Sequence, residues 1–85
     1  MKTITLHCAG IETKQQLHAA LASALNFPEW YGHNLDALYD CLTDLDEAVH
    51  LYIVDWQQLP EWKAAFRAVF DDAENDSPVF TVSFA

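Results

Sequence analysis

The feature of the sequence that most constrains the fold is the alternation of strand-like segments with stretches of helical periodicity. Residues 2–8 alternate between apolar and polar side chains, residues 49–55 are almost continuously apolar, and residues 79–84 are rich in β-branched and aromatic residues. Such patterns are typical of β-strands. Two segments with apolar residues at helical spacing separate the first strand from the second, and one separates the second from the third. The predicted order is therefore β-α-α-β-α-β.

Local signals indicate where the first and third helices begin. Thr13 with Gln16 three positions later is a capping-box signature, so the first helix is predicted over about residues 13–25. Pro60 suits the first turn of a helix, and an apolar stripe follows it. The third helix is therefore predicted over about residues 60–74.

The second helix follows an ordered loop that contains a proline and a glycine. Gly32 is one of two glycines in the chain, and its place before Asn34 predicts a turn with positive φ at the glycine. Asn34 is a good N-cap, and the helix is expected to end near Thr43 or Asp44. Its predicted buried stripe is formed by Leu35, Leu38, Cys41 and Leu42.

The order of elements predicts the fold class. Strands joined by helical crossovers pair in parallel, and such crossovers are right-handed. The strand at residues 49–55 is apolar on both sides apart from His50, which favours an interior strand in a sheet covered by helices. Residues 1–85 are thus expected to form one small α/β domain, with helices packed on a three-stranded parallel sheet. The order of the strands within the sheet does not follow from the pattern.

The charge of the chain limits the classes of partner. The formal net charge is −9, and only Lys2, Lys14, Lys63 and Arg67 are basic. A field of one sign argues against direct binding to nucleic acid or to an anionic membrane. It favours rapid encounter with a cationic protein, although charge alone leaves a role in solubility open.

The rest of the composition is typical of a globular chain. No apolar run approaches the length of about 18 residues that a membrane helix requires, and the first residues lack the apolar core of a signal peptide. We therefore expect a cytoplasmic protein. Cys8 falls in the first strand and Cys41 among the leucines of the second helix, and both thiols are expected to be free and buried.

Three carboxylates recur at intervals of four residues along the second helix, at Asp36, Asp40 and Asp44. Like charges at this spacing cost a helix about 0.2–0.5 kcal/mol per pair. The helix dipole disfavours acids toward the C-terminus by about 0.3–1 kcal/mol each. No Lys or Arg is near in the sequence to relieve them. A helix selected only for stability would place a lysine here, so the row indicates a surface that binds a basic partner.

Aromatic residues accompany these acids. Tyr39 is next to Asp40 and lies off the apolar stripe, and Trp30 stands in the loop before the helix. Aromatic side chains beside charges are typical of interface hot spots. We therefore predict that Trp30 and Tyr39 contribute to the binding surface, whereas Tyr31 belongs to the core.

Catalysis or metal binding by the same acids has less support. Two aspartates on a convex helix form no cleft of the kind that paired catalytic carboxylates need. The sequence has neither a phosphate-binding glycine loop nor a recognisable nucleophile motif. His33, Asp36 and Asp40 could approach one divalent cation, but they lack zinc-type spacing. We expect a protein that is not an enzyme and that uses no cofactor; a small hydrolase using Asp36 and Asp40 is the weakest hypothesis.

The run PEWYGHNLDALYDCLT at residues 28–43 resembles the barstar family of intracellular ribonuclease inhibitors. The family pattern there is P-x-aromatic-aromatic-G-x-N-L-D-A-L-x-D-C-L-T. Weaker similarity extends along essentially the whole chain, including Leu17-His18, Asp55-Trp56 and Val69-Phe70. The resemblance implies a three-stranded parallel sheet with helices, in agreement with the pattern of the residues.

The resemblance also implies roles for individual residues. In the family, the second helix and the preceding loop occlude the active site of a guanyl-specific ribonuclease, where one carboxylate takes the place of the substrate phosphate. By position that carboxylate is Asp40, with Asp36 one turn earlier. Trp30 and Tyr39 fall at aromatic contact positions, and Asp72 falls at an acidic contact position of the third helix. A fixed carboxylate can pair with the Arg, Lys or His that a nuclease presents to phosphate.

The sequence departs from the family pattern where the second helix ends, because Asp44-Leu45 stand in place of Gly-Trp. We predict a barstar-like inhibitor of a basic ribonuclease, either guanyl-specific or a toxin nuclease, that serves in self-protection or immunity. The alternative is an acidic module for a different basic partner, such as an unrelated toxin. The free protein is expected to be a monomer. The predicted partner-binding residues are Trp30, Asp36, Tyr39, Asp40, Asp44 and Asp72.

Overall fold

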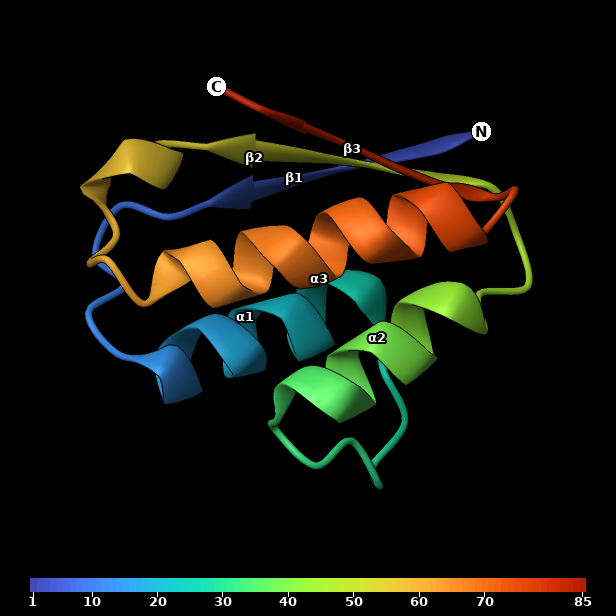
Figure 1. Ribbon diagram of the computed structural model, residues 1–85, viewed down its shortest axis with the longest axis horizontal. Helices are drawn as coiled ribbons and strands as arrows, with labels where there is room; N and C mark the ends of the chain where they lie inside the picture. The colour runs from blue at the N-terminus through green and yellow to red at the C-terminus, as the bar shows by residue number, and fades with distance from the viewer.

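The computed structural model describes all 85 residues and contains the predicted order of elements (Figure 1). The strands are parallel, so the predicted α/β fold with a three-stranded parallel sheet is confirmed. A short 3₁₀ helix after the second strand is an addition to the predicted elements. The elements are β1 (Lys2–His7), α1 (Lys14–Leu25), α2 (Leu35–Thr43), β2 (Val49–Val54), the 3₁₀ helix (Trp56–Gln58), α3 (Lys63–Asp76) and β3 (Phe80–Phe84).

The strand order is β1-β2-β3, with β2 in the centre. In the register of the sheet, Lys2 lies opposite Val49, and Val49 lies opposite Phe80. Figure 1 shows all three helices on one side of the sheet. α1 packs on β1 and α3 packs on β3, whereas α2 packs against α3 on the side away from the strands. α2 is therefore the outermost helix.

The other face of the sheet is open, whereas the apolar character of β2 favoured a sheet covered by helices. Leu51 is fully buried beneath the helices, whereas Tyr52 is exposed on the opposite face. His50 lies on this open face and bonds through Nδ1 to Thr81 Oγ1 (2.7 Å) and through Nε2 to Ser83 Oγ (2.8 Å). Hydroxyl groups of the neighbouring strand thus satisfy both ring nitrogens of the half-buried His50.

The predicted start of α1 is confirmed. Gln16 N–H donates to Thr13 Oγ1 at 3.1 Å, and Thr13 N–H donates to Gln16 Oε1 at 3.1 Å, so both halves of the capping box are present. The helix ends at Leu25 and is capped by Asn26, which adopts the left-handed conformation with φ of 56°. Asparagine is, after glycine, the residue that most often takes this role at a helix end.

α3 begins and ends later than predicted, at Lys63 and Asp76. Pro60 belongs to a turn before the helix, where its carbonyl accepts a hydrogen bond of 3.0 Å from Lys63 N–H. The ammonium group of Lys63 also donates to the carbonyl of Leu59 at 3.1 Å. The chain therefore completes a turn at the proline before the helix starts.

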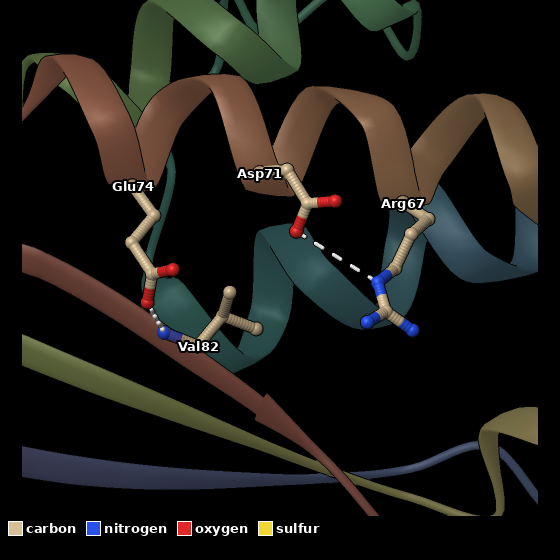
Figure 2. A network of polar contacts seen from close by, with 4 residues as sticks. All are labelled: Arg67, Asp71, Glu74 and Val82. Carbon is tan, nitrogen blue, oxygen red and sulfur yellow. Dashed lines mark hydrogen bonds and ion pairs between the residues drawn. The ribbon is translucent and has the colours of Figure 1, made fainter.

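α3 is tied to the outer edge of β3, as Figure 2 shows. Glu74 Oε2 accepts a hydrogen bond of 2.8 Å from Val82 N–H. The guanidinium of Arg67 lies 3.8 Å from the centre of the Phe84 ring, and its Nε is 3.7 Å from Asp71 Oδ1. Arg67 is thus engaged on the β3 side of α3.

The core is a single cluster of buried side chains from every strand and helix. Cys8 and Cys41 belong to it as free thiols, as predicted. None of the helices has the length and apolar composition that spanning a bilayer would require. The largest fully buried side chains include Leu17, Leu21, Leu38, Leu42, Leu51, Ile53, Phe66, Phe70 and Phe80.

Candidate partner-binding surface

Helix α2 presents its acids to solvent because its apolar side is held by the core. Leu38 and Leu42 are fully buried and Cys41 is nearly so. Asp36 and Asp40 are exposed. Residues four apart lie on the same side of a helix. The structure therefore places these two carboxylates one turn apart on the outer surface of α2.

The turn before α2 differs from the expectation in one respect. Asn34 Oδ1 accepts a hydrogen bond of 2.8 Å from Ala37 N–H, so the predicted N-cap is confirmed. The positive φ, however, is at His33 (52°) and not at Gly32. Gly32 instead leaves room for the side chain of Asn34, because a Cβ on residue 32 would lie 2.9 Å from Asn34 Nδ2. The cap side chain folds back over the glycine, and the left-handed step falls one residue later.

Tyr39 joins α2 to α3. Its side chain is half-buried, and its hydroxyl donates a hydrogen bond to the carboxylate of Asp76. That hydrogen bond, together with desolvation and the negative charges of Asp76, Asp72 and Asp40, raises the pKa of Tyr39. Carboxylates from both helices therefore surround one phenol. Tyr39 is both a surface residue and a link between the two helices.

Asp76 is a residue of this surface that the sequence interpretation did not include. The sequence carried a signal for it, because Asp72 and Asp76 are four residues apart in α3, as Asp36 and Asp40 are in α2. Only the packing of α3 against α2 reveals that the two acidic rows belong to one surface. We call this surface, formed by Asp36, Tyr39, Asp40, Asp72 and Asp76, the α2–α3 acidic surface.

The two neighbouring aromatic residues in the loop before α2 differ in burial, as predicted. Trp30 is 64% exposed, whereas Tyr31 is buried and its hydroxyl forms a hydrogen bond of 2.5 Å with His18 Nδ1. Burial raises the pKa of Tyr31 above its usual range. Together with Asp44, Trp30 lines a hollow at the C-terminal end of α2, and Tyr39 is not among the residues that line it. The six predicted residues thus fall into two groups.

Basic side chains leave the carboxylates of α2 unpaired. The protein contains two ion pairs, Lys2–Glu47 at 3.8 Å and Arg67–Asp71 at 3.7 Å, and neither includes an acid of α2. Both pairs are exposed to solvent, where such contacts are worth little. The negative potential of α2 is therefore open to an external cation.

The structure contains no group of three or more His, Cys, Asp or Glu side chains placed to hold a metal ion. His33, Asp36 and Asp40 accordingly do not form a cation site. His33 Nδ1 instead lies 3.1 Å from Gln15 Oε1 of α1.

The fold and this surface define a class of protein: a small parallel α/β protein with its helices on one face of the sheet and with an outer helix that carries unpaired carboxylates. Comparison with known families narrows the class. The model of the family described as barstar (barnase inhibitor) matches residues 1–84, and the chain belongs to this family.

A curated relative from Bacillus subtilis (strain 168) carries the name "Putative ribonuclease inhibitor YrdF". It is 46% identical to the chain over 43 residues, which are 51% of this chain and 47% of the relative. The match thus spans about half the length of each protein.

Proposed function

We propose that the protein is an intracellular inhibitor, acting in the cytoplasm, that binds a basic ribonuclease and occludes its active site in self-protection or immunity. The observation that carries the proposal is membership of the barstar family across residues 1–84. The partial match to a relative named as a ribonuclease inhibitor supports the same class. Residues 1–85 act in this proposal as one inhibitor domain.

The chemistry of the partner explains the acids. A ribonuclease must present cationic side chains to the phosphate of its substrate, and a carboxylate fixed on a rigid helix can pair with the same groups. In the proposal Asp40 takes the phosphate position, and Asp36 and Asp72 add negative charge around it. Trp30 and Tyr39 supply contact area, as aromatic residues commonly do at interfaces.

The proposal assigns binding to the protein and no catalysis. Inhibition requires only that the acidic surface remains in the active site, so a preorganised surface is sufficient. The N-cap at Asn34 and the hydrogen bond from Tyr39 to Asp76 favour such rigidity, because they fix the start of α2 and its position against α3.

The proposal is tested by titrating the purified protein against a guanyl-specific ribonuclease and following cleavage of an RNA substrate at low and at moderate salt. We expect stoichiometric loss of activity at low salt and weaker inhibition at moderate salt, because the attraction is electrostatic. No inhibition in either condition by a protein shown to be folded by circular dichroism would exclude that enzyme class.

Two further outcomes would redirect the proposal. Binding to a basic toxin without inhibition of any ribonuclease would favour the acidic module for a different partner. The break in the family pattern at Asp44-Leu45 is the observation that supports an acidic module for a different partner. Turnover of a substrate by the protein alone would contradict an inhibitor and favour a hydrolase.

A further inference from the structure

A hollow of about 490 Å³ lies beside the C-terminal end of α2, between the loop that follows α1 and the first residues of β1 and β2. Its apolar walls include Ile4, Leu25 and Val49. Trp30 stands among the lining residues with 64% of its surface exposed. The hollow is distinct from the α2–α3 acidic surface, because none of the five residues of that surface lines it.

The lining is unusually negative for a hollow with apolar walls. Asp44, Asp46 and Glu47 all line it, and Lys2 is the one basic residue that does. Lys2 Nζ is 3.8 Å from a Glu47 oxygen, with both side chains largely exposed, so this pair neutralises little. Three carboxylates therefore face one loosely held ammonium group.

Two helices add to this negative potential. α1 ends at Leu25 and α2 ends at Thr43, so the hollow receives the carbonyl end of both. Neither helix has a basic residue in its last turn. A helix C-terminus carries about half a negative charge, and a cation there is favourable. Nothing in the chain provides that cation except Lys2.

We infer that this hollow receives an arginine side chain of the ribonuclease, as a second anchor beside the contact at Asp40; the inference rests on the proposed function. The apolar walls suit the methylene stem of arginine. The carboxylates suit its planar fork of donors, and the exposed ring of Trp30 offers a face for a cation–π contact. Arginine fits better than lysine because its weakly hydrated, planar cation both stacks and forms paired hydrogen bonds.

The position of the hollow supports a protein partner. It adjoins Asp44 at the end of the same helix that carries Asp36 and Asp40, so a protein docked on α2 passes over it. Trp and Arg are the residue types most enriched at the centres of protein interfaces. The hollow would extend the interface along α2 from the acidic row to the loop with Trp30.

The first test uses a small probe and does not require the ribonuclease. N-acetyl-L-arginine amide is titrated into the protein while the indole N–H signal of Trp30 is followed by NMR. We expect a saturable shift with an apparent Kd on the order of millimolar, and at least a fivefold weaker effect from the neutral citrulline analogue. Absence of saturable binding, or equal binding of citrulline, would overturn the inference.

Matched variants make the test specific. Asp44→Asn and Glu47→Gln each remove one charge from the hollow, whereas Glu12→Gln removes one exposed charge ahead of the opposite end of α1. We expect the first two to weaken arginine amide binding about threefold or more and the third to leave it unchanged. Equal effects of all three would show a general charge effect and contradict a site.

The second test uses the ribonuclease itself. Trp30→Ala and Asp44→Asn are expected to raise the Kd of the complex about tenfold, mainly through faster dissociation, with Glu12→Gln as the control. If these variants bind as the parent does while the parent inhibits fully, the inference fails, Trp30 is not an interface contact, and ribonuclease inhibition through Asp40 stands. If the parent binds arginine amide but no ribonuclease, the hollow remains an arginine site and the ribonuclease is excluded as its partner.

Discussion

The exposed carboxylate of Asp40 does not stabilise the helix that carries it. Asp40 is exposed, belongs to neither ion pair and stands one turn from another aspartate. Such a pair costs a helix about 0.2–0.5 kcal/mol, so the fold gains nothing from Asp40. Under the proposed function, Asp40 opposes its own helix in the free protein and meets its cation in the complex.

Replacing this carboxylate separates binding from stability. We expect Asp40→Ala to raise the Kd for the ribonuclease about a thousandfold, a loss of about 4 kcal/mol, because it removes a central charge from the interface. The free energy of unfolding should change by less than about 0.5 kcal/mol, since the side chain is exposed. Binding is measured by stopped-flow kinetics and stability by urea denaturation.

The matched control is Asp71→Ala, which changes an exposed aspartate on the β3 side of α3 and should bind normally. Comparable binding by both variants would show that Asp40 is not the central contact.

The buried imidazole of His18 makes the stability of the folded protein depend on pH. His18 is 3% exposed, bonds to Tyr31 and packs against Phe66 with ring centres 4.8 Å apart. Burial, and then the nearby His33, lowers the pKa of His18. The unfolded chain, with a histidine pKa of about 6.5, therefore binds more protons than the folded one in weak acid. The stabilisation from neutral His18 is complete above about pH 6.5 and is lost as the pH falls toward the folded pKa.

The expected result is a free energy of unfolding that declines from pH 7 to pH 5 in the parent and declines less in His18→Asn. Urea denaturation at half-unit intervals of pH measures both curves. His33→Asn changes an exposed histidine and should retain most of the parental slope. A slope that is unchanged in His18→Asn and lost in His33→Asn would contradict the assignment.

At the scale of elements, α3 protects the edge of the sheet as well as covering it. β3 is an outer strand, and the Val82 N–H would be free to pair with another chain if Glu74 did not accept its hydrogen bond. Figure 2 shows Glu74 reaching from α3 to this group. A helix side chain thus takes the place that a further strand would occupy.

Removing this acceptor should expose the edge. We expect Glu74→Ala to lower the free energy of unfolding by about 1 kcal/mol and to increase self-association, whereas Glu74→Gln keeps an acceptor oxygen and stays monomeric. Urea denaturation and sedimentation velocity measure the two effects. If glutamine behaves as alanine does, the hydrogen bond to Val82 is not the protecting contact.

The elements themselves were largely predictable because their signals are local. The capping box at Thr13 and the N-cap at Asn34 depend on side chains within three residues, and both occur as the sequence indicates. The open face of the sheet was not predictable from β2 alone, since Tyr52 is as compatible with burial as with exposure. Strand order is likewise a property of long-range packing, and local periodicity does not encode it.

The candidate surface was likewise predictable where its residues lie on one helix, and not where packing brings distant residues together. Sequence spacing was enough to place Asp36 and Asp40 together, because both lie on one helix. Asp76 escaped notice because its neighbour Tyr39 is far away in the sequence and meets it only through the packing of two helices. The hollow with Trp30 could not be predicted for the same reason, since three separate stretches of the chain build its walls.

For the molecule as a whole, none of the four basic residues forms an ion pair with an acid of α2. The ammonium of Lys63 bonds to backbone carbonyls at the start of α3, Arg67 lies over Phe84, and Lys2 pairs with Glu47. Within the net charge of −9, the exposed carboxylates of α2 and their neighbours Asp72 and Asp76 remain unpaired on the side where the two helices meet solvent. A basic partner would be steered to that side.

This asymmetry predicts how salt affects the complex. Raising the ionic strength from about 10 mM to about 150 mM should lower the association rate constant for the ribonuclease at least tenfold, because it shortens the Debye length from about 30 Å to about 8 Å. The dissociation rate constant should change little, since contacts inside the interface are poorly screened. Stopped-flow measurements over a salt series separate the two constants. A salt dependence carried mainly by dissociation would contradict long-range steering.

The link between Tyr39 and Asp76 has a consequence for biosynthesis. During translation α2 leaves the ribosome before α3, which carries the remaining carboxylates of the acidic surface. A nascent chain stopped before residue 72 would carry Asp36 and Asp40 but would lack Asp72, Asp76 and strand β3. Under the proposed function, a molecule could therefore capture a ribonuclease only after the residues through β3 have been translated and have folded. Ribonuclease binding would then distinguish folded molecules from copies truncated before β3.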